Sequence, residues 1–264
     1  MIDTHLHLSH SRFGHDREAV LERAQAAGVV GAVEVGWDLE SSAAAVALAA
    51  RHPGVLFPAA GIHPHYAAKA PDGAIDLLRE LARRAPLVAV GETGLDFHRD
   101  LSPRDRQEDL FRQHIRLARE LALPLVVHSR SATARVLELL EQEMDGDPAG
   151  GVLHCFSGDR EEARRAAGLG FHLGVGGALT YGDPELAAVV SAASAHLLLL
   201  ETDAPYLTPE PGRRERNEPA RLAAVRDRIA LLRGSSPAAV DRLTTENAAR
   251  LFRLPAAATA GDRS

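Results

Sequence analysis

The sequence has a single cysteine, Cys155, among its 264 residues. An internal disulfide is therefore excluded, and the protein suits a reducing compartment. No run approaches the roughly 20 apolar residues that are needed to cross a bilayer, and the N-terminus lacks the basic and apolar regions of a signal peptide. We therefore expect a cytoplasmic protein that has no contact with membranes.

The sequence also has no excess of positive charge. Its 30 lysines and arginines are outnumbered by 36 aspartates and glutamates, and the formal net charge is −6. A protein that grips long duplex DNA through many phosphates displays a basic face. Contact with nucleic acid must therefore be local, which favours action at a chain end, and no obligate protein partner is indicated.

Short apolar runs rich in β-branched residues recur along the chain, and segments with helical patterning lie between them. The runs cover residues 1–5, 29–35, 55–63, 87–92, 124–128, 151–154, 171–176 and 196–203. Strands that are apolar throughout and alternate with helices indicate a parallel sheet covered on both faces. For the helix ends, we expect Ser102 and Pro103 to be an N-cap and a first helical residue, and Gly28 to follow a helix that begins near Asp16.

Eight strand–helix units in a chain of this length predict an α/β protein with a single TIM-type (β/α)8 barrel, which typically takes about 250 residues. The barrel domain would span residues 1–264. An open, doubly wound sheet is the alternative, but no G-x-G-x-x-G motif follows the first strand. A pair of helices after the arginine-rich loop at 209–219 would close the chain.

Histidines and acidic residues stand at the ends of five of the apolar runs: His5, His7, Glu92, His128, His154 and Asp203. The C-terminal ends of the strands build the active site of a barrel. His5 and His7 are two residues apart on a strand, so both side chains point to the same face. Any one of these residues alone could be a hydrogen-bonded structural group, but six on one rim predict a metal site.

Imidazoles and carboxylates suit zinc, manganese or other divalent cations, and the lack of a cysteine cluster argues against a closed structural zinc site. Four histidines and two carboxylates are more than one catalytic ion needs. Two ions that share one carboxylate use the set more naturally. His10 falls outside the set and is expected to be solvated.

Other polar residues on the same rim leave two interpretations open. Arg130, two residues beyond His128, is either a fork for phosphate oxygens or a partner in a surface salt bridge. His63, which shares the GIHPH segment with His65, is expected to contact substrate or to order the groups around a ligand, or else is a structural, hydrogen-bonded histidine. Asp96 either orients a ligand or caps the turn that follows it.

Arg213, Arg214 and Arg216 supply local positive charge for a DNA strand or belong to a solvated loop. Cys155 is read as a small packing residue. Its side chain is expected to face away from that of His154, because neighbouring strand residues alternate.

Several segments are motifs of a known family: DTHLH at Asp3, GIHPH at Gly61, GETGLDF at Gly91, PLVVHSR at Pro124, GVLHCFSG at Gly151, LETDAPYL at Glu201, RNEP at Arg216 and TTENAARLF at Thr244. With these motifs the chain resembles the TatD-type metal-dependent deoxyribonucleases of the amidohydrolase superfamily, over nearly its whole length. It departs from them at His98, where relatives often carry tyrosine, and at Ser131, where an acidic residue is common. Both departures bear on substrate preference.

The resemblance implies a somewhat distorted barrel with a two-metal site at the C-terminal ends of the strands. One ion would be held by His5, His7, Glu92 and Asp203, and the second by Glu92, His128 and His154. Glu92 would then bridge the two ions.

The predicted activity is metal-dependent hydrolysis of phosphodiester bonds, as in a deoxyribonuclease of the 3'-5' exonuclease type. Two divalent ions (Zn, Mn or Mg) would activate the attacking water, with Glu92 and Asp203 catalytic and Asp203 also the acceptor of the water's proton. His63 and Arg130 would bind the substrate, which is DNA as single strands or chain ends. The alternatives are an amidohydrolase-type enzyme acting on a small amide, ester or lactone, and a non-catalytic metal-binding protein.

Overall fold

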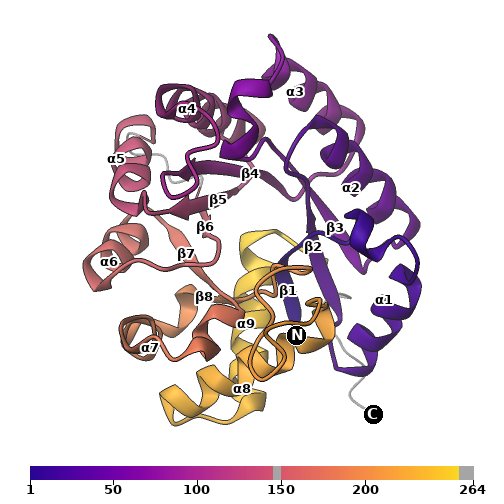
Figure 1. The fold of residues 1–264 in the computed structure, drawn as a ribbon, viewed down its shortest axis with the longest axis vertical. Helices are drawn as coiled ribbons and strands as arrows, with labels where there is room; N and C mark the ends of the chain where they lie inside the picture. Colours follow the sequence, from indigo (N-terminus) through magenta and orange to yellow (C-terminus); the bar gives the residue numbers. More distant parts are fainter. Residues whose placement is uncertain (145–149, 256–264) are drawn as a thin grey trace.

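The structure is a computed structural model that describes residues 1–144 and 150–255. Parallel strands form one sheet in the order of the chain, and Leu6 pairs with Ala204 beside the last strand, so the first and last strands meet (Figure 1). The strands are β1 (Ile2–Leu6), β2 (Gly31–Val35), β3 (Leu56–Ala60), β4 (Ala89–Asp96), β5 (Leu125–Arg130), β6 (Gly151–Leu153), β7 (Phe171–Val175) and β8 (Leu198–Leu200). This arrangement confirms the predicted TIM-type barrel.

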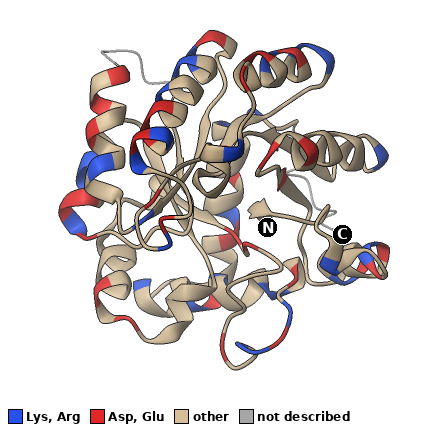
Figure 2. Cartoon of the chain, turned by 45° about the horizontal axis from the view of Figure 1, so that its top comes forward, with Lys and Arg blue, Asp and Glu red and all other residues tan. Residues whose placement is uncertain are grey.

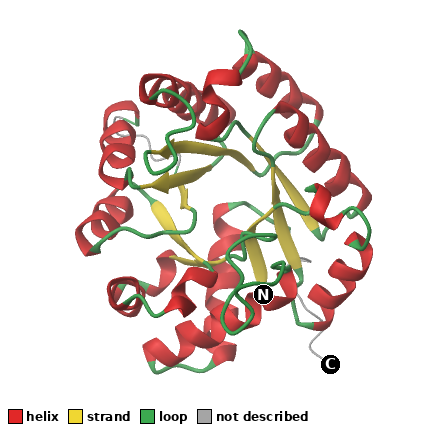
Figure 3. Ribbon diagram, viewed as in Figure 1, coloured by secondary structure: helices red, strands yellow, loops and turns green. Residues whose placement is uncertain are grey.

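An outer ring of helices covers the strands (Figure 3). The helices are α1 (Arg17–Ala26), α2 (Leu39–Arg51), α3 (Ala74–Arg84), α4 (Arg104–Leu121), α5 (Thr133–Glu143), α6 (Arg160–Gly168), α7 (Pro184–Ala192), α8 (Leu222–Arg233) and α9 (Pro237–Leu251). Short 3₁₀ turns are η1 (Ser11–Phe13), η2 (Pro64–Lys69), η3 (Gly177–Tyr181), η4 (Ala195–Leu197) and η5 (Pro219–Arg221). As predicted, α8 and α9 follow the arginine-rich loop.

The barrel is irregular where the polar residues gather. β6 and β8 have three residues each, and the register shifts between β1 and β2 and between β4 and β5. β4 continues past Glu92 to Asp96, so Glu92 lies inside its strand rather than at the end. Gly94 permits this continuation, because a Cβ atom there would lie 2.0 Å from the carbonyl oxygen of His128.

Apolar side chains from seven of the strands fill the barrel at the end opposite the candidate ligands, and they form one cluster with the end of α9. The cluster comprises Ile2, Val33, Val35, Phe57, Ala59, Ala89, Val126, Val152, Leu199, Ala248, Phe252 and Leu254. Val126 and Val152 precede His128 and His154 by two residues, and side chains two apart share a face. The same alternation that builds this apolar floor therefore places the two histidines above it.

The end of α1 and the start of α4 were both predicted from the sequence. Gly28 follows α1 with a φ of +85°, as expected of a residue that ends a helix. The prediction for α4 was wrong by one position, since Pro103 is the N-cap and Arg104 the first residue. Ser102 is instead buried, and its hydroxyl donates to the carbonyl of His65 and accepts from the backbone N–H of Ala68. Because the hydroxyl of Ser102 is engaged in these two hydrogen bonds, it does not cap the helix.

Residues of both charges are intermixed along the outer helices (Figure 2). Many form ion pairs, such as Arg135 with Glu108 at 2.5 Å and Arg165 with Glu141 at 3.0 Å. Positive charge on the outer helices is therefore largely offset locally. None of the helices in the described part of the chain has the length and apolar character needed to span a lipid bilayer.

Candidate metal centre

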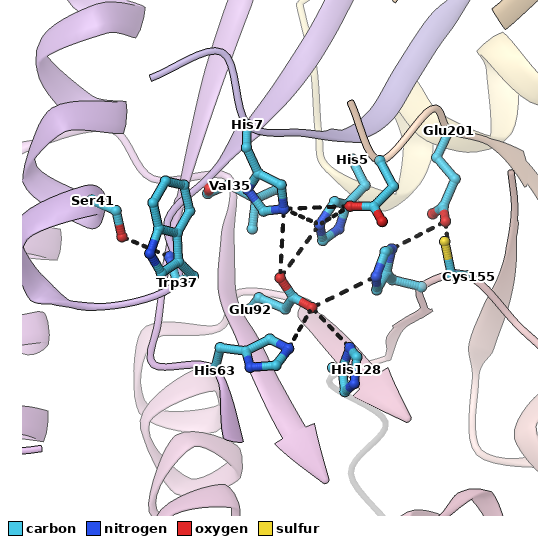
Figure 4. A network of polar contacts seen from close by, with 12 residues as sticks. His5, His7, Val35, Trp37, Ser41, His63, Glu92, His128, Cys155 and Glu201 are labelled. Atoms are coloured by element: carbon cyan, nitrogen blue, oxygen red, sulfur yellow. Dashed lines mark hydrogen bonds and ion pairs between the residues drawn. The ribbon is translucent and has the colours of Figure 1, made fainter. Parts of the chain in front are cut away.

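The six predicted ligands lie together, with His154 and Asp203 close to the others. Figure 4 shows Glu92 between His5 and His7 on one side and His63 and His128 on the other. The carboxylate of Glu92 divides the ligands into two groups. Oε2 faces Nε2 of His5 at 3.5 Å and Nε2 of His7 at 3.8 Å. Oδ1 of Asp203 faces the same two nitrogens, at 3.8 Å from His5 and 3.5 Å from His7. His5, His7, Glu92 and Asp203 therefore surround one point.

The other oxygen of Glu92 faces a second set of imidazoles. Oε1 lies 3.1 Å from Nδ1 of His128, 3.6 Å from Nε2 of His154 and 3.5 Å from Nε2 of His63. His63, Glu92 and His128 offer ligand atoms that are all within 4.8 Å of one another. His63, predicted as a substrate contact, thus stands among the candidate ligands as well.

The spacing of the donor atoms fits divalent cations. Two nitrogens bound to one tetrahedral zinc ion at 2.0–2.1 Å are about 3.3 Å apart. Nε2 of His5 and Nε2 of His7 are 3.2 Å apart, with their ring edges directed at the same carboxylates. Imidazole nitrogens with carboxylate oxygens are also the donor set that zinc and manganese accept. The clusters are therefore suited to binding metal.

Charge in the centre favours an ionised Glu92. Burial by itself raises the pKa of this carboxyl, but the neighbouring imidazoles of His63 and His5 and the hydrogen bond from His128 outweigh burial, so the pKa falls well below its ordinary value. Burial has the opposite effect on the imidazole of His63 and lowers its pKa well below the ordinary value of histidine. Glu92 is therefore already in the ionised state in which a carboxylate ligates metal.

A buried glutamate, Glu201, contacts the ring nitrogen of His154 that points away from Glu92. Its Oε1 accepts hydrogen bonds from Nδ1 of His154 at 3.1 Å and from the backbone N–H of Cys155 at 2.6 Å. Burial lowers the pKa of His154, but the nearby carboxylates of Glu201, Glu92 and Asp203 raise it to about 10. Sequence reasoning missed Glu201, although a carboxylate inside the apolar run HLLLLETD is a usable signal.

Asp96 plays both of the roles that the sequence left open. Its Oδ2 accepts from Nε2 of His128 at 3.1 Å and from Nε2 of His65 at 2.9 Å, so it orients a candidate ligand. Its Oδ1 accepts from the backbone N–H groups of His98 and Arg99, so it also fixes the turn after β4. Gln107 of α4 in turn accepts from the backbone N–H of Asp96.

Asp3 joins the two chain segments that carry His5 and Asp203. Its carboxylate accepts from the hydroxyl of Thr202 at 2.5 Å and from the N–H of Thr202 at 2.9 Å. Burial raises the pKa of Asp3 to about 8, against the lowering effect of these hydrogen bonds. The N–H of Asp203 donates to the carbonyl of His5 at 2.9 Å, which completes the connection.

The remaining predictions have mixed outcomes. Arg130 is exposed at the end of β5, and no carboxylate lies within ion-pair distance of it in residues 1–144 and 150–255, so the salt bridge is not formed there. His10 lies outside the candidate centre, as predicted, but it is half-buried next to Trp37 and Tyr206 instead of solvated. Arg216 is not a free loop cation either, because it pairs with Asp16 at 2.6 Å.

The prediction for the side chain of Cys155 was wrong. β6 ends at Leu153, and Cys155 has a φ of +45°, so strand alternation no longer applies there. The sulfur lies within 4.8 Å of ligand atoms of both His154 and Glu201 instead of facing away. Burial, together with the charge of Glu201, raises the pKa of the thiol well above its ordinary value, so Cys155 stays a neutral packing group.

Comparison with known proteins decides the family. The family model described as "TatD related DNase" matches residues 2–253. The chain belongs to the TatD-related DNase family. The resemblance seen in the motifs is thereby confirmed, and the match covers every strand and helix described above.

Relatives within the TatD-related DNases match along nearly the full length of both chains. A Cronobacter sakazakii protein named "3'-5' ssDNA/RNA exonuclease TatD" is 43% identical over 258 residues, 96% of this chain and 97% of that one. A Bacillus subtilis protein named "uncharacterized metal-dependent hydrolase YabD" is 38% identical over 255 residues, 96% of this chain and 99% of its own. The crystal structure of YJJV, a TatD homologue from Escherichia coli, superposes with a TM-score of 0.90 at 33% identity and covers 97% of this chain and 98% of that one.

Proposed function

We propose that this protein is a metal-dependent exonuclease that hydrolyses phosphodiester bonds at the 3' end of single-stranded nucleic acid. The observation that carries the proposal is the position of Glu92, whose Oε2 faces His5 and His7 and whose Oε1 faces His128, His154 and His63. A carboxylate in that position suits a bridge between two cations. The similarity to proteins named as 3'-5' ssDNA/RNA exonucleases supplies the substrate and the direction of cleavage.

The first ion would be held by His5, His7, Glu92 and Asp203, and the second by Glu92, His128 and His154, with His63 beside the second. Divalent cations bound there would lower the pKa of water towards neutrality and hold the attacking and leaving oxygens of an in-line displacement. The buried floor of the barrel excludes bulk water from below, which strengthens these electrostatic interactions.

Asp203 accepts the proton of the attacking water in this proposal. Oδ1 faces His5 and His7, whereas Oδ2 has no hydrogen bond or ion pair to another residue in the described ranges. The side chain is 13% exposed, against 4% for Glu92, so it lies on the open side of the centre where substrate enters. Arg130, which is exposed at the end of β5 two residues beyond His128, binds the phosphate in this proposal.

The test is a metal-dependence assay on defined oligonucleotides with the parent protein, Glu92→Gln and Asp203→Asn. A strand labelled at its 5' end should shorten one nucleotide at a time, and a strand labelled at its 3' end should release labelled mononucleotide at once. Both variants should lose activity by at least about a hundred-fold, because each removes a ligand or the base. Glu108→Gln on α4 is the control, since this carboxylate only pairs with Arg135.

The same assay separates the proposal from its alternatives. Turnover of small esters, amides or lactones without shortening of any strand would identify the other type of amidohydrolase. Internal cleavage of a circular single strand would contradict an exonuclease. Activity that survives complete removal of divalent metal would contradict the metal centre.

A further inference from the structure

Two aromatic rings stand beside the candidate metal centre, and nothing in the hydrolytic mechanism uses them. Trp37 follows β2 and lies edge-on to the ring of His7, with centroids 5.2 Å apart and planes at 84° (Figure 4). Tyr206 comes from the loop after β8 and approaches the same imidazole at 6.2 Å and 71°. His10 lies near both rings, at 5.7 Å from Trp37 and 6.0 Å from Tyr206.

Both rings keep contact with solvent. Tyr206 is 44% exposed and its neighbour Leu207 is 37% exposed, while Trp37 is partly buried. Large apolar side chains are ordinarily withdrawn into the core, and a group of exposed ones marks a binding surface. Here both rings lie edge-on to His7, a candidate metal ligand, so the surface adjoins the centre where the substrate would be cleaved.

The backbone around each ring is fixed by hydrogen bonds. The N–H of Trp37 donates to the hydroxyl of Ser41 at 2.8 Å, at the capped start of α2. The N–H of Tyr206 donates to the carbonyl of Asp203 at 2.7 Å, and the carbonyl of Tyr206 accepts from the side-chain amide of Asn217 at 2.6 Å. The main chain that carries each ring is therefore held in place before a ligand arrives, which reduces the entropy lost on binding.

A cation lies next to this pair. The guanidinium of Arg12 is 5.6 Å from the centroid of the Tyr206 ring. Arg12 is exposed, and within the described part of the chain no carboxylate is at ion-pair distance from it. Other surface arginines, such as Arg135 and Arg165, do have such partners. An unpaired guanidinium beside an exposed ring suits a phosphate that is joined to an aromatic base.

We propose that Trp37 and Tyr206 form a stacking site for an unpaired nucleobase of the substrate strand, and that Arg12 binds a phosphate of the same strand. The inference rests on the proposed function, and it assigns to these residues the selection of single-stranded over double-stranded substrate. Every base has a π-face, so stacking tolerates any sequence. A base within a duplex is already stacked and paired, so only a single strand or a frayed end can occupy the site without an unpairing cost.

Trp37 is the only tryptophan of the chain, so its fluorescence reports directly on the proposed site. The metal-loaded parent protein is titrated with a phosphorothioate oligothymidylate, which resists cleavage, and with an abasic strand of the same length and backbone. The base-bearing strand should quench the fluorescence in a saturable way. The abasic strand should bind about five-fold more weakly or worse and leave the fluorescence unchanged.

Variants separate stacking from packing. Trp37→Leu and Tyr206→Leu keep an apolar side chain without a π-face, and each should raise KM for single-stranded DNA about five-fold or more while kcat stays within about two-fold. Trp37→Phe should retain most of the affinity. Leu231→Ala is the matched control, because Leu231 is 72% exposed on α8 and touches no part of the centre.

Three outcomes would overturn the stacking site: an unchanged KM in both leucine variants, equal affinity for the base-bearing and abasic strands, or loss of bound metal in Trp37→Leu, which would assign the ring to packing against His7. The fluorescence titration needs no cleavage. A protein that binds the base-bearing strand but hydrolyses no oligonucleotide with any divalent metal would therefore contradict the proposed function and leave the stacking site standing.

Discussion

Glu201 and His154 form a buried pair in which the carboxylate decides how the imidazole faces the centre. Nδ1 of His154 lies 3.1 Å from Glu201, and Nε2 of the same ring lies 3.6 Å from Glu92. His128 shows the opposite arrangement, with Nε2 directed at Asp96 and Nδ1 directed at Glu92. In both rings a second carboxylate occupies one nitrogen and leaves the other for a cation.

Glu201→Gln should weaken metal binding. The variant keeps the size of the side chain but removes the charge that fixes the tautomer of His154. Loss of such an outer partner typically costs about 10- to 100-fold in metal affinity. Titration calorimetry with Zn²⁺ or Mn²⁺ measures the effect, and Glu143→Gln, which only disturbs surface pairs with Arg112 and Arg116, is the control. Parental affinity in Glu201→Gln would show that the pair is structural.

Asp96→Asn should distinguish the contact of Asp96 with the histidine rings from its contact with the backbone of the following turn. Asparagine keeps an oxygen for the backbone N–H groups of His98 and Arg99 but cannot accept from both His128 and His65. We expect kcat/KM to fall about 10- to 100-fold with a small change in melting temperature. Asp96→Ala should lose both activity and stability. A fall in melting temperature as large in the asparagine variant as in the alanine variant would assign Asp96 to the turn alone.

Gly174→Ala should disturb the position of Glu201. A Cβ atom at residue 174 would lie 2.2 Å from Oε2 of Glu201 and 3.2 Å from Cα of His154. Overpacking of this kind costs about 1–3 kcal/mol of unfolding free energy. Gly168→Ala is the matched control, since nothing lies within 4 Å of its added Cβ and alanine favours the helix. Urea unfolding of both variants checks the difference, and equal stability would show that Glu201 moves aside freely.

The fold and the inner ring of the candidate centre were predictable because both follow from short-range rules. Apolar strands that alternate with helices give a parallel barrel, and residues two apart on a strand share a face, so the convergence of His5, His7, His128 and His154 follows from their positions. The structure places these side chains on one rim, as expected. Whether they bind two ions stays a prediction.

Asp96 was among the residues read as orienting a ligand, but the contact between Glu201 and His154 was missed, because it depends on side chains that meet across the barrel. β7 lies between β6 and β8, and Glu201 contacts His154 only because Gly174 of β7 has no side chain in the way. The side-chain direction of Cys155 was also predicted wrongly, because side chains alternate between faces only within a strand. Its strand had already ended, and no pattern in GVLHCFSG marks that end.

His114 provides a pH-dependent test of the core that does not involve the metal centre. It lies fully buried in α4, where Nδ1 faces the carbonyl of Leu110 at 2.8 Å and Nε2 accepts from the N–H of Ile62 at 3.1 Å. Burial lowers its pKa from 6.5 to about 4. Both contacts are made by a neutral imidazole, so the folded protein resists protonation of this ring.

Stability should therefore fall as the pH drops from 6.5 to 4. In this window the unfolded chain binds a proton at residue 114 and the folded chain does not, so acid favours unfolding. The ring contributes about 3 kcal/mol of this loss over the whole window and about 2 kcal/mol between pH 7 and pH 5. His114→Gln offers a neutral donor and acceptor and should lack this part of the slope. Urea unfolding of metal-free protein at pH 7 and pH 5 measures it, and parallel losses in parent and variant would mean that His114 is protonated in the folded state.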